Sequence, residues 1–352
     1  MNIDLLRRLS EARGVPGQED EIRQIVADEL RDLCDLRVDA MGNLICTKKP
    51  TKGSGGPKVM IAAHMDEIGF VVKYIEDKGF LRLHTLGGFD FRQLASQRVI
   101  VNTKNGPIPG LLMMSAKPKH LLGASEPESA KSMDDFFVDI GMSGDDAKAA
   151  VEIGDMVTMD RNFQEMGDLV TGKAMDDRLA VFVMIEAVKA LGDHACEVVA
   201  VATVQEEIGL RGATASGSAI QPDIVVALDV TLANDIPGLS ESLYCTRLGQ
   251  GTAIKILDSS LICHPLLVKH FRSVAEQYSI PYQMELLTAG GTDAGGVQRL
   301  NGGIPAFTLS MPTRYIHTVN ETSHKGDIQA SIDLLARYLE HAHEGNYAYP
   351  TP

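Results

Sequence analysis

Two adjacent glutamates follow an apolar run in the segment VATVQEEIGLRGA. The run Val198–Val204 is typical of a buried strand, and Glu206 and Glu207 come directly after it. Like charges side by side repel each other and lose hydration, so a hydrophobic core gains nothing from them. The pair makes chemical sense if one carboxylate holds a cation while its neighbour accepts and returns a proton. The alternative is a solvated loop after the strand.

A histidine and an aspartate follow a second apolar run, in KVMIAAHMDEIGF. Residues 58–63 predict a short buried strand, and its period-two alternation sends His64 and Asp66 to the same side. A metal-binding imidazole usually donates its second N–H to a carboxylate. Asp66 is placed for that role, although an isolated pair of this kind also fits a solvated strand end.

Two aspartates stand together in GKAMDDRLA, just before a predicted helix. One carboxylate of Asp176 and Asp177 could bridge two cations while the other accepts local hydrogen bonds. The alternative is a purely structural role for both aspartates, because acidic residues at a helix N-terminus cap the helix and complement its dipole.

The set is completed by Asp229, inside the apolar strand 224–230, and by His317, after the apolar run 304–311 and a proline turn. A charge inside such a strand needs a partner or a cation. The alternatives are an aspartate that caps the following turn and a histidine that is buried in the core without a chemical role. Along the chain the order is His, Asp, Glu-Glu, Asp, His, mostly at strand ends, where ligands gather in α/β sheets. This pattern predicts a two-metal hydrolase.

The elements that must position these residues alternate between strand and helix. Helical periodicity covers residues 3–12, 18–33, 178–191, 264–278 and 327–342, and a hairpin turns at Gly42-Asn43. We therefore expect an α/β fold with a mixed sheet flanked by helices. Between residues 69 and 168 the pattern changes to short β segments separated by Gly and Pro turns, with a polar surface loop at 123–132. The prediction is a catalytic domain of residues 1–68 plus 169–352 and an inserted β-rich domain of residues 69–168.

The amino-acid composition indicates which classes of protein and which partners fit this chain. The chain has 352 residues, 44% of them hydrophobic and 23% charged, as in ordinary globular proteins. A net charge of −14 argues against partners such as nucleic acid or an anionic membrane surface. No apolar run approaches the roughly 20 residues of a membrane-spanning helix. The five cysteines lack CxxC spacing, which favours reduced thiols and a cytoplasmic location.

Taken together, the motifs resemble the signature blocks of the family 42 metallo-aminopeptidases. This family includes the tetrahedral and glutamyl aminopeptidases, some of them labelled endoglucanases. The matching blocks occur in the family's order and are HMDEIGF, GKAMDDR, QEEIGLRGA, ALDV, GGTDAGG and RYIHT. The resemblance covers nearly the whole chain. It implies an aminopeptidase that removes N-terminal residues from short peptides, with the middle segment as an oligomerisation domain and a twelve-subunit hollow tetrahedron as the assembly.

The resemblance also implies a site. Two divalent ions, zinc or cobalt, activate a water, and the peptide bond after the bridging aspartate is often cis. The implied metal ligands are His64 and Asp229 for one ion, Glu207 and His317 for the other, and Asp176 between both. Asp66 orients His64, and Glu206 is the general base. In TAGGTDAGG, Gly291, Thr292 and Asp293 are candidates for lining the substrate pocket, although this stretch could instead be a tight structural loop.

One segment departs from the family pattern. Family members commonly continue from the last ligand into a Ser-Pro-Val-Glu-like stretch, whereas this chain has Thr318-Val319-Asn320-Glu321. Two other functions are alternatives: a glycoside hydrolase, which also uses paired carboxylates but needs no histidine ligands, and a non-catalytic peptide-binding protein. The preferred N-terminal residue does not follow from the motifs, because acidic, basic and neutral preferences all occur in the family.

Overall fold

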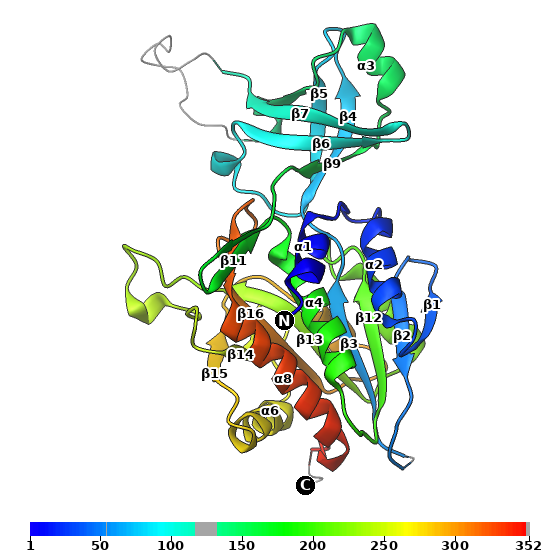
Figure 1. Cartoon of the computed structure of the whole chain (residues 1–352), viewed down its shortest axis with the longest axis vertical. Coiled ribbons are helices and arrows are strands. Elements are labelled where there is room, and N and C mark those ends of the chain that lie inside the picture. The colour runs from blue at the N-terminus through cyan, green and yellow to red at the C-terminus, as the bar shows by residue number, and fades with distance from the viewer. Residues whose placement is uncertain (54, 117–131, 350–352) are drawn as a thin grey trace.

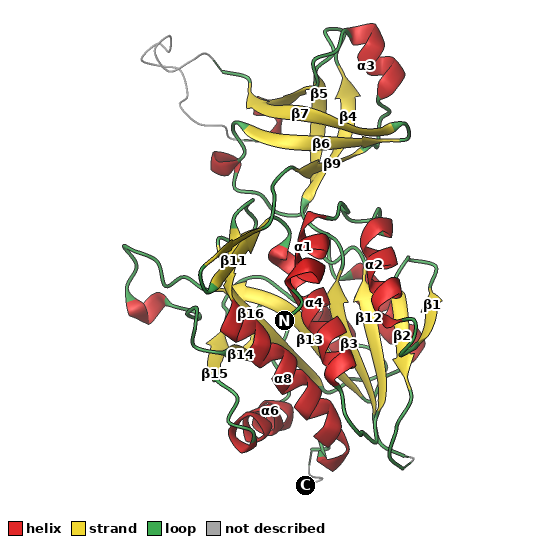
Figure 2. Ribbon diagram, in the orientation of Figure 1, coloured by secondary structure: helices red, strands yellow, loops and turns green. Residues whose placement is uncertain are grey.

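The computed structural model describes residues 1–53, 55–116 and 132–349, so most of the predicted loop at 123–132 lies outside the described residues. A large sheet with helices packed on it forms one part of the molecule, and a smaller β-rich part that carries α3 lies beyond one end of it (Figures 1 and 2). The helices are α1 (Ile3–Glu11), α2 (Asp20–Leu30), α3 (Gly144–Ala150), α4 (Met175–Ala190), α5 (Arg211–Ile220), α6 (Pro265–Gln277), α7 (Asp293–Gln298) and α8 (Lys325–His341).

The large sheet is mixed, as predicted. Its strands run in the order β1 (Asp35–Val38), β2 (Leu44–Lys48), β12 (Glu197–Thr203), β3 (Lys58–His64), β13 (Ile224–Leu232), β16 (Ala306–Arg314), β17 (Glu321–His324), β11 (Leu169–Gly172) and β10 (Gln164–Met166). A branch, β14 (Thr252–Leu257) and β15 (Tyr282–Leu286), joins at β16. The four central strands β12, β3, β13 and β16 are mutually parallel. Their carboxyl ends therefore meet at one edge of the sheet.

Helices cover these central strands on both faces. In β3, β12 and β13 nearly every residue is buried regardless of the side to which it points, which is the pattern of a strand covered on both faces. Helix α4 packs on β3 and β13 and is itself covered by α1, α2 and α8, whereas α5 and α7 pack together against β12, β13 and β16. The predicted α/β class is confirmed.

The inserted β-rich part is a closed barrel with its own core. Its strands follow the order β4 (Gly69–Ile75), β5 (Leu81–Leu86), β8 (Phe136–Asp139), β7 (Gly106–Met114), β6 (Gln97–Thr103) and β9 (Met156–Met159), and β9 closes on β4. Phe70, Val99, Leu112 and Phe136 are fully buried inside it, in a cluster separate from the core of the large sheet. Among the described residues, no helix is long and apolar enough to cross a membrane.

Candidate metal centre

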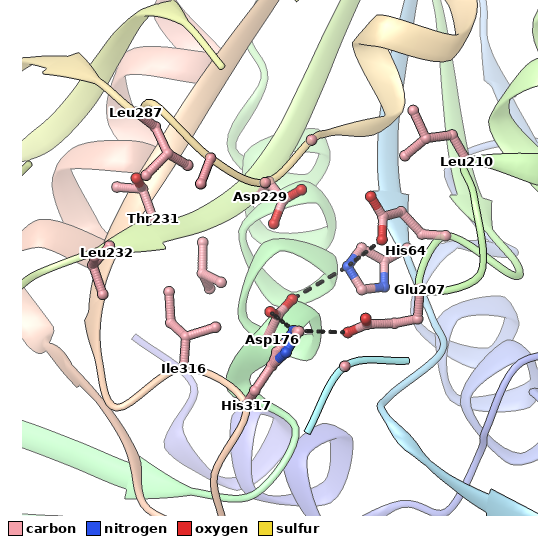
Figure 3. Close-up of a pocket in the computed structure, with 16 residues that line it drawn as sticks. His64, Asp176, Glu207, Leu210, Asp229, Thr231, Leu232, Leu287, Ile316 and His317 are labelled. Atoms are coloured by element: carbon pink, nitrogen blue, oxygen red, sulfur yellow. Dashed lines mark ion pairs between the residues drawn. The ribbon is translucent and has the colours of Figure 1, made fainter. Parts of the chain in front are cut away.

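A cavity of about 490 Å³ opens at the carboxyl edge of the parallel strands (Figure 3). His64 is the last residue of β3, and Asp229 lies in the carboxyl-terminal half of β13. The loop after β12 supplies the glutamate pair, the first turn of α4 supplies Asp176, and the loop after β16 supplies His317. All five predicted metal ligands and the predicted base line this one cavity: His64, Asp176, Glu206, Glu207, Asp229 and His317.

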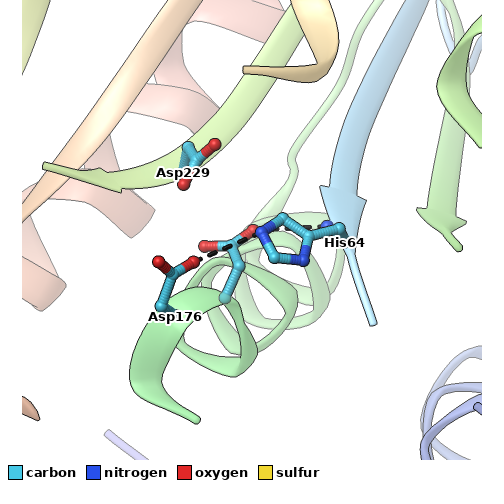
Figure 4. Close-up of side chains that lie close together, drawn as sticks. His64, Asp176 and Asp229 are labelled. Carbon is cyan, nitrogen blue, oxygen red and sulfur yellow. Dashed lines mark hydrogen bonds and ion pairs between the residues drawn. The ribbon is translucent and has the colours of Figure 1, made fainter. Parts of the chain in front are cut away.

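Asp176 lies between the two histidines. Its Oδ1 is 3.3 Å from Nε2 of His64 (Figures 3 and 4), and its Oδ2 is 3.4 Å from Nε2 of His317 (Figure 3). On the far side, Nε2 of His317 is 3.4 Å from Oε1 of Glu207. One carboxylate thus presents one oxygen to each histidine, which is the arrangement that a bridging ligand requires.

The donor atoms form two groups that share this aspartate. In the first group, one ligand atom from each of His64, Asp176, Asp177 and Asp229 lies within 4.8 Å of the others. The second group, with the same spacing, consists of Asp176, Glu207 and His317. Imidazole nitrogens and carboxylate oxygens suit zinc, cobalt and manganese.

The carboxylates are crowded and buried, with few positive charges near them. Burial is the main reason that the pKa of the Glu206 carboxyl lies well above its usual value, and the negative charge of Asp229 adds to the effect. Burial likewise raises the pKa of Asp229 well above its usual value, with Asp176 contributing next. Carboxyl groups that resist ionisation in one cleft would be stabilised in their charged form by a bound cation.

The pKa values of the histidines are raised as well, but by the neighbouring carboxylates. Burial opposes a charged imidazole, but the carboxylates around it, first Asp177 and then Asp176, raise the pKa of His64 well above its usual value. At His317 burial is again outweighed, and Asp176 and Glu207 raise its pKa to about 12. Each imidazole is therefore held by carboxylate oxygens that accept its N–H. As a metal ligand, the same nitrogen would instead direct its lone pair at a cation.

Two poorly satisfied oxygens provide a test of whether the site fits a cation. Among the described residues, Oδ1 of Asp177 is buried without a hydrogen-bond partner, and Oε1 of Glu207 is buried with only the 3.4 Å ion-pair contact to Nε2 of His317. A buried carboxylate oxygen without a donor is costly, and a bound cation would satisfy it. The residues present therefore fit divalent metal ions.

Asp66 has a wider role than the motif indicated. Nδ1 of His64 lies 3.0 Å from the backbone carbonyl oxygen of Asp66 and 3.6 Å from its carboxylate Oδ1. The two carboxylate oxygens accept the backbone N–H groups of Glu206 and Glu207, at 3.0 and 3.1 Å. Asp66 is fully buried and so fixes the backbone of the glutamate pair as well as facing the His64 ring.

Glu321 is a site residue that the sequence analysis missed. It is 2% exposed, and its two carboxylate oxygens accept the backbone N–H groups of Asp176, at 2.9 Å, and of His317, at 2.7 Å. One side chain thus fixes the backbone of two predicted ligands. The available signal was the stretch that departs from the family pattern, because that stretch still ends in a glutamate four residues after His317.

For the second aspartate of the DD pair, the sequence predicted only that it accepts local hydrogen bonds. Asp177 is fully buried, and its Oδ2 accepts the backbone N–H of His64 at 3.2 Å. The Asp176–Asp177 peptide bond is cis, as the resemblance implied. Asp177 therefore belongs to the immediate surroundings of His64.

Of the three residues predicted to line the substrate pocket, one lines the cavity and two do not. Gly291 lines the cavity. Thr292 and Asp293 are each 2% exposed and are not among the lining residues. Oγ1 of Thr292 donates to Asp258 at 3.2 Å, and the carboxylate of Asp293 accepts from Oγ1 of Thr203 at 2.5 Å. These two side chains support the loop from behind instead of facing the cavity.

A buried charge cluster, also missed from the sequence, holds the site's elements together. Nζ of Lys173 lies 2.8 Å from both carboxylate oxygens of Glu67, and Nη2 of Arg178 lies 3.3 Å from one of them. The fully buried Arg178 also donates to the carbonyl oxygens of Leu9, Ala12, Gly14 and Met65. This cluster joins the turn after β3 to the first turn of α4 and to the loop after α1.

A cavity rich in histidine and carboxylate donors at the carboxyl edge of an α/β sheet defines, as a class, a metal-dependent hydrolase. The family model of the M42 glutamyl aminopeptidases matches residues 42–334, and the chain belongs to this family of metal-dependent peptidases. The resemblance stated from the motifs is confirmed.

Individual relatives agree with this assignment. The lysyl aminopeptidase of Pyrococcus furiosus is 34% identical over 344 residues, which cover 96% of each chain. An aminopeptidase structure from the archaeon Desulfurococcus kamchatkensis superposes with a TM-score of 0.91 at 38% identity, covering 97% of this chain and 95% of that one. The TET1 peptidase of Pyrococcus horikoshii, which can assemble into a tetrahedron or a large octahedral shell, gives 0.85 at 32% identity and covers 96% and 98%.

Proposed function

We propose that this protein removes the N-terminal residue from short peptides, using two divalent metal ions and Glu206 as the general base. The observation that carries the proposal is the position of Asp176, which has one carboxylate oxygen near each of the two histidines. A single-ion site would not need a shared carboxylate with a histidine on each side. Family membership supports the peptidase activity.

Two ligand sets would hold the ions. His64 and Asp229 would bind one, Glu207 and His317 the other, and Asp176 would bridge them. When bound, such a pair of ions lowers the pKa of a water and polarises a carbonyl group. Zinc and cobalt are the ions we propose, because nitrogen and oxygen donors suit both.

Glu206 is the residue we assign to proton transfer. It lines the cavity with its side chain 11% exposed, and its Oε2 lies 3.9 Å from Nε2 of His64. Its backbone is held by Asp66, so the carboxylate is positioned in advance. Glu206 would take a proton from the attacking water and return it to the leaving amine, a contribution of about 10²–10⁴-fold in rate.

Selectivity for a free N-terminus would follow if the α-amine of the substrate is anchored near the ions. An acetylated N-terminus has no free amine to place there. The substrates we propose are therefore short peptides with an unblocked N-terminus.

Assembly and location belong to the proposal as well. The assembly of the Pyrococcus horikoshii relative supports a homo-oligomer here, with a tetrahedral dodecamer as the proposed form and the domain of residues 69–168 as its oligomerisation part. All five cysteines are free, which supports a reducing compartment such as the cytoplasm.

The test is hydrolysis of aminoacyl p-nitroanilides after chelation, with and without added zinc or cobalt. Matched substrates with free and N-acetylated amines should differ, with metal-dependent cleavage of the free ones alone. Equal cleavage of both forms would contradict the exopeptidase proposal. No cleavage by a folded, metal-loaded protein would favour a peptide-binding protein instead.

A further inference from the structure

One side of the cavity is apolar. Leu232, Leu287 and Ile316 lie on the side of Asp229 that faces away from His64, and Thr231 lies beside them (Figure 3). We call this wall, formed by Thr231, Leu232, Leu287 and Ile316, the apolar arm. A peptide whose N-terminus and scissile carbonyl lie at the carboxylates would have its first side chain within reach of this arm.

The apolar arm contains no charge that could pair with a charged substrate side chain. Among the described residues that line the cavity, none is Lys or Arg, and every ionisable side chain belongs to the metal centre. Glutamyl and lysyl preferences are both found in the names of the family and its relatives, so membership alone does not decide between them. The lining itself has to decide.

A buried ion pair lies behind the arm and contacts it through Thr231. Lys255 and Glu285 are fully buried, with Nζ of Lys255 2.5 Å from Oε1 of Glu285. The same oxygen accepts the hydroxyl of Thr231 at 2.6 Å, which occupies the one polar side chain of the arm. Both side chains are fully buried and neither lines the cavity, so they do not place a charge on the arm.

From this lining we infer that the apolar arm selects peptides whose first residue is neutral and aliphatic, of the size of leucine, methionine or norleucine. The inference rests on the proposed aminopeptidase function and adds its substrate class. A charged side chain on the arm would lose hydration without gaining a partner, whereas an aliphatic one gains from leaving water. Leu287 is the specificity-determining residue we single out, because it lies directly after β15 at the arm's edge.

Matched pairs of substrates test the inference with little change in size. Glutamine and glutamate differ by charge at nearly equal shape, and norleucine and lysine differ by the terminal ammonium group. With p-nitroanilides of these four residues and of leucine, kcat/KM for the neutral member of each pair should exceed that of the charged member at least about tenfold. Binding of the free amino acids to the metal-loaded protein, measured by calorimetry, should follow the same order.

Two lysine substitutions at adjacent leucines locate the effect. Leu287→Lys places a cation on the arm and should raise the ratio of glutamate to glutamine cleavage by about tenfold or more while lowering leucine cleavage. Leu286→Lys is the matched control, because Leu286 is 51% exposed and does not line the cavity. That variant should keep the wild-type ratios. Equal shifts in both variants, or in neither, would overturn the role of the arm.

The outcomes separate this inference from the function on which it rests. Faster cleavage of glutamate or lysine than of its neutral partner would overturn the aliphatic preference and leave the aminopeptidase proposal standing. Failure to cleave any free-amine substrate, by a protein shown to be folded and metal-loaded, would overturn both.

Discussion

Asp176 organises the candidate metal centre at the scale of single residues. Burial opposes its ionisation, but hydrogen bonds from His317 and His64 hold the pKa of Asp176 below its ordinary value. Its carboxylate is therefore ionised and placed between two imidazoles, while the surrounding carboxyl groups have raised pKa values. Two divalent ions would bring four positive charges to this cluster and remove the conflict.

Glu206 and Glu207 should respond differently to the same substitution. Glu206→Gln removes the proton acceptor but no proposed metal ligand, so turnover should fall by a factor of about 100 or more while metal content stays at the wild-type level. Glu207→Gln is the matched control and should lower metal content, because it weakens one ligand set. Steady-state kinetics and elemental analysis measure both properties. A Glu206→Gln enzyme with full activity would remove Glu206 from the role of base.

Buried ion pairs hold the site together at the scale of secondary-structure elements. Arg178, in the first turn of α4, donates to carbonyl oxygens of α1, of the loop after it and of the turn after β3, and it contacts Glu67. Arg178→Met leaves these acceptors and the Glu67 charge less well satisfied in the interior. Stability should fall by about 3–5 kcal/mol, measured by denaturant unfolding.

An exposed arginine provides the control for that measurement. Arg337 on α8 pairs with Glu340 but is 47% exposed, so Arg337→Met should cost less than about 1 kcal/mol. Equal losses in the two variants would mean that burial of the Arg178 cluster contributes nothing specific.

Glu19, just before α2, predicts a pH dependence of stability. Its Oε1 accepts the backbone N–H groups of Gly17, at 2.6 Å, and of Gln205, at 3.2 Å, and so supports the loop that carries Glu206. Burial is the main cause that raises the pKa of Glu19 from 4.5 to about 7. The folded state thus binds this proton more tightly than the unfolded state, so the stability it contributes is complete below about pH 4.5 and is lost as pH rises to about 7.

The variant Glu19→Gln isolates this effect, because an amide oxygen can keep both hydrogen bonds without the charge. In chelated protein, the variant should match the wild type near pH 4 and exceed it by about 3 kcal/mol above pH 8. Denaturant unfolding at several pH values gives the difference. Parallel stability curves for the two proteins would contradict the prediction.

The positions of the metal-site residues followed from local sequence patterns, whereas their supports did not. An apolar run that ends in His64 or in Glu206 is visible in the sequence, and parallel strands bring such ends to one edge of the sheet. The hydrogen bond between Asp176 and Glu321 joins residues 145 positions apart in the sequence. A local sequence pattern cannot predict a contact between residues so far apart. The apolar arm was missed for the same reason, because leucine and isoleucine in three separate loops or strands look like ordinary core residues.

The closed barrel bears on how whole molecules associate. Leu111 and Met113 alternate on β7 with their side chains outward, 51% and 36% exposed, and Ile153 is 63% exposed. The two exposed apolar side chains that follow each other on one face of β7 fit a surface that becomes buried on association. This supports the proposal that the barrel mediates oligomerisation.

A charge on the barrel should weaken that association. Leu111→Asp places a carboxylate on the exposed face of β7, so sedimentation should show smaller species while the folded subunit keeps its thermal stability. Leu243→Asp is the control, since Leu243 is 64% exposed but lies outside the barrel. An unchanged mass for Leu111→Asp would place the interface elsewhere.

The most direct test of the two-metal site is anomalous diffraction from crystals of the protein loaded with zinc or cobalt. We predict two ions per chain about 3.5–4 Å apart. Asp176 should bridge them, with His64 and Asp229 on one ion and Glu207 and His317 on the other. A single ion in the fully loaded protein, or two ions that do not share Asp176, would contradict the account.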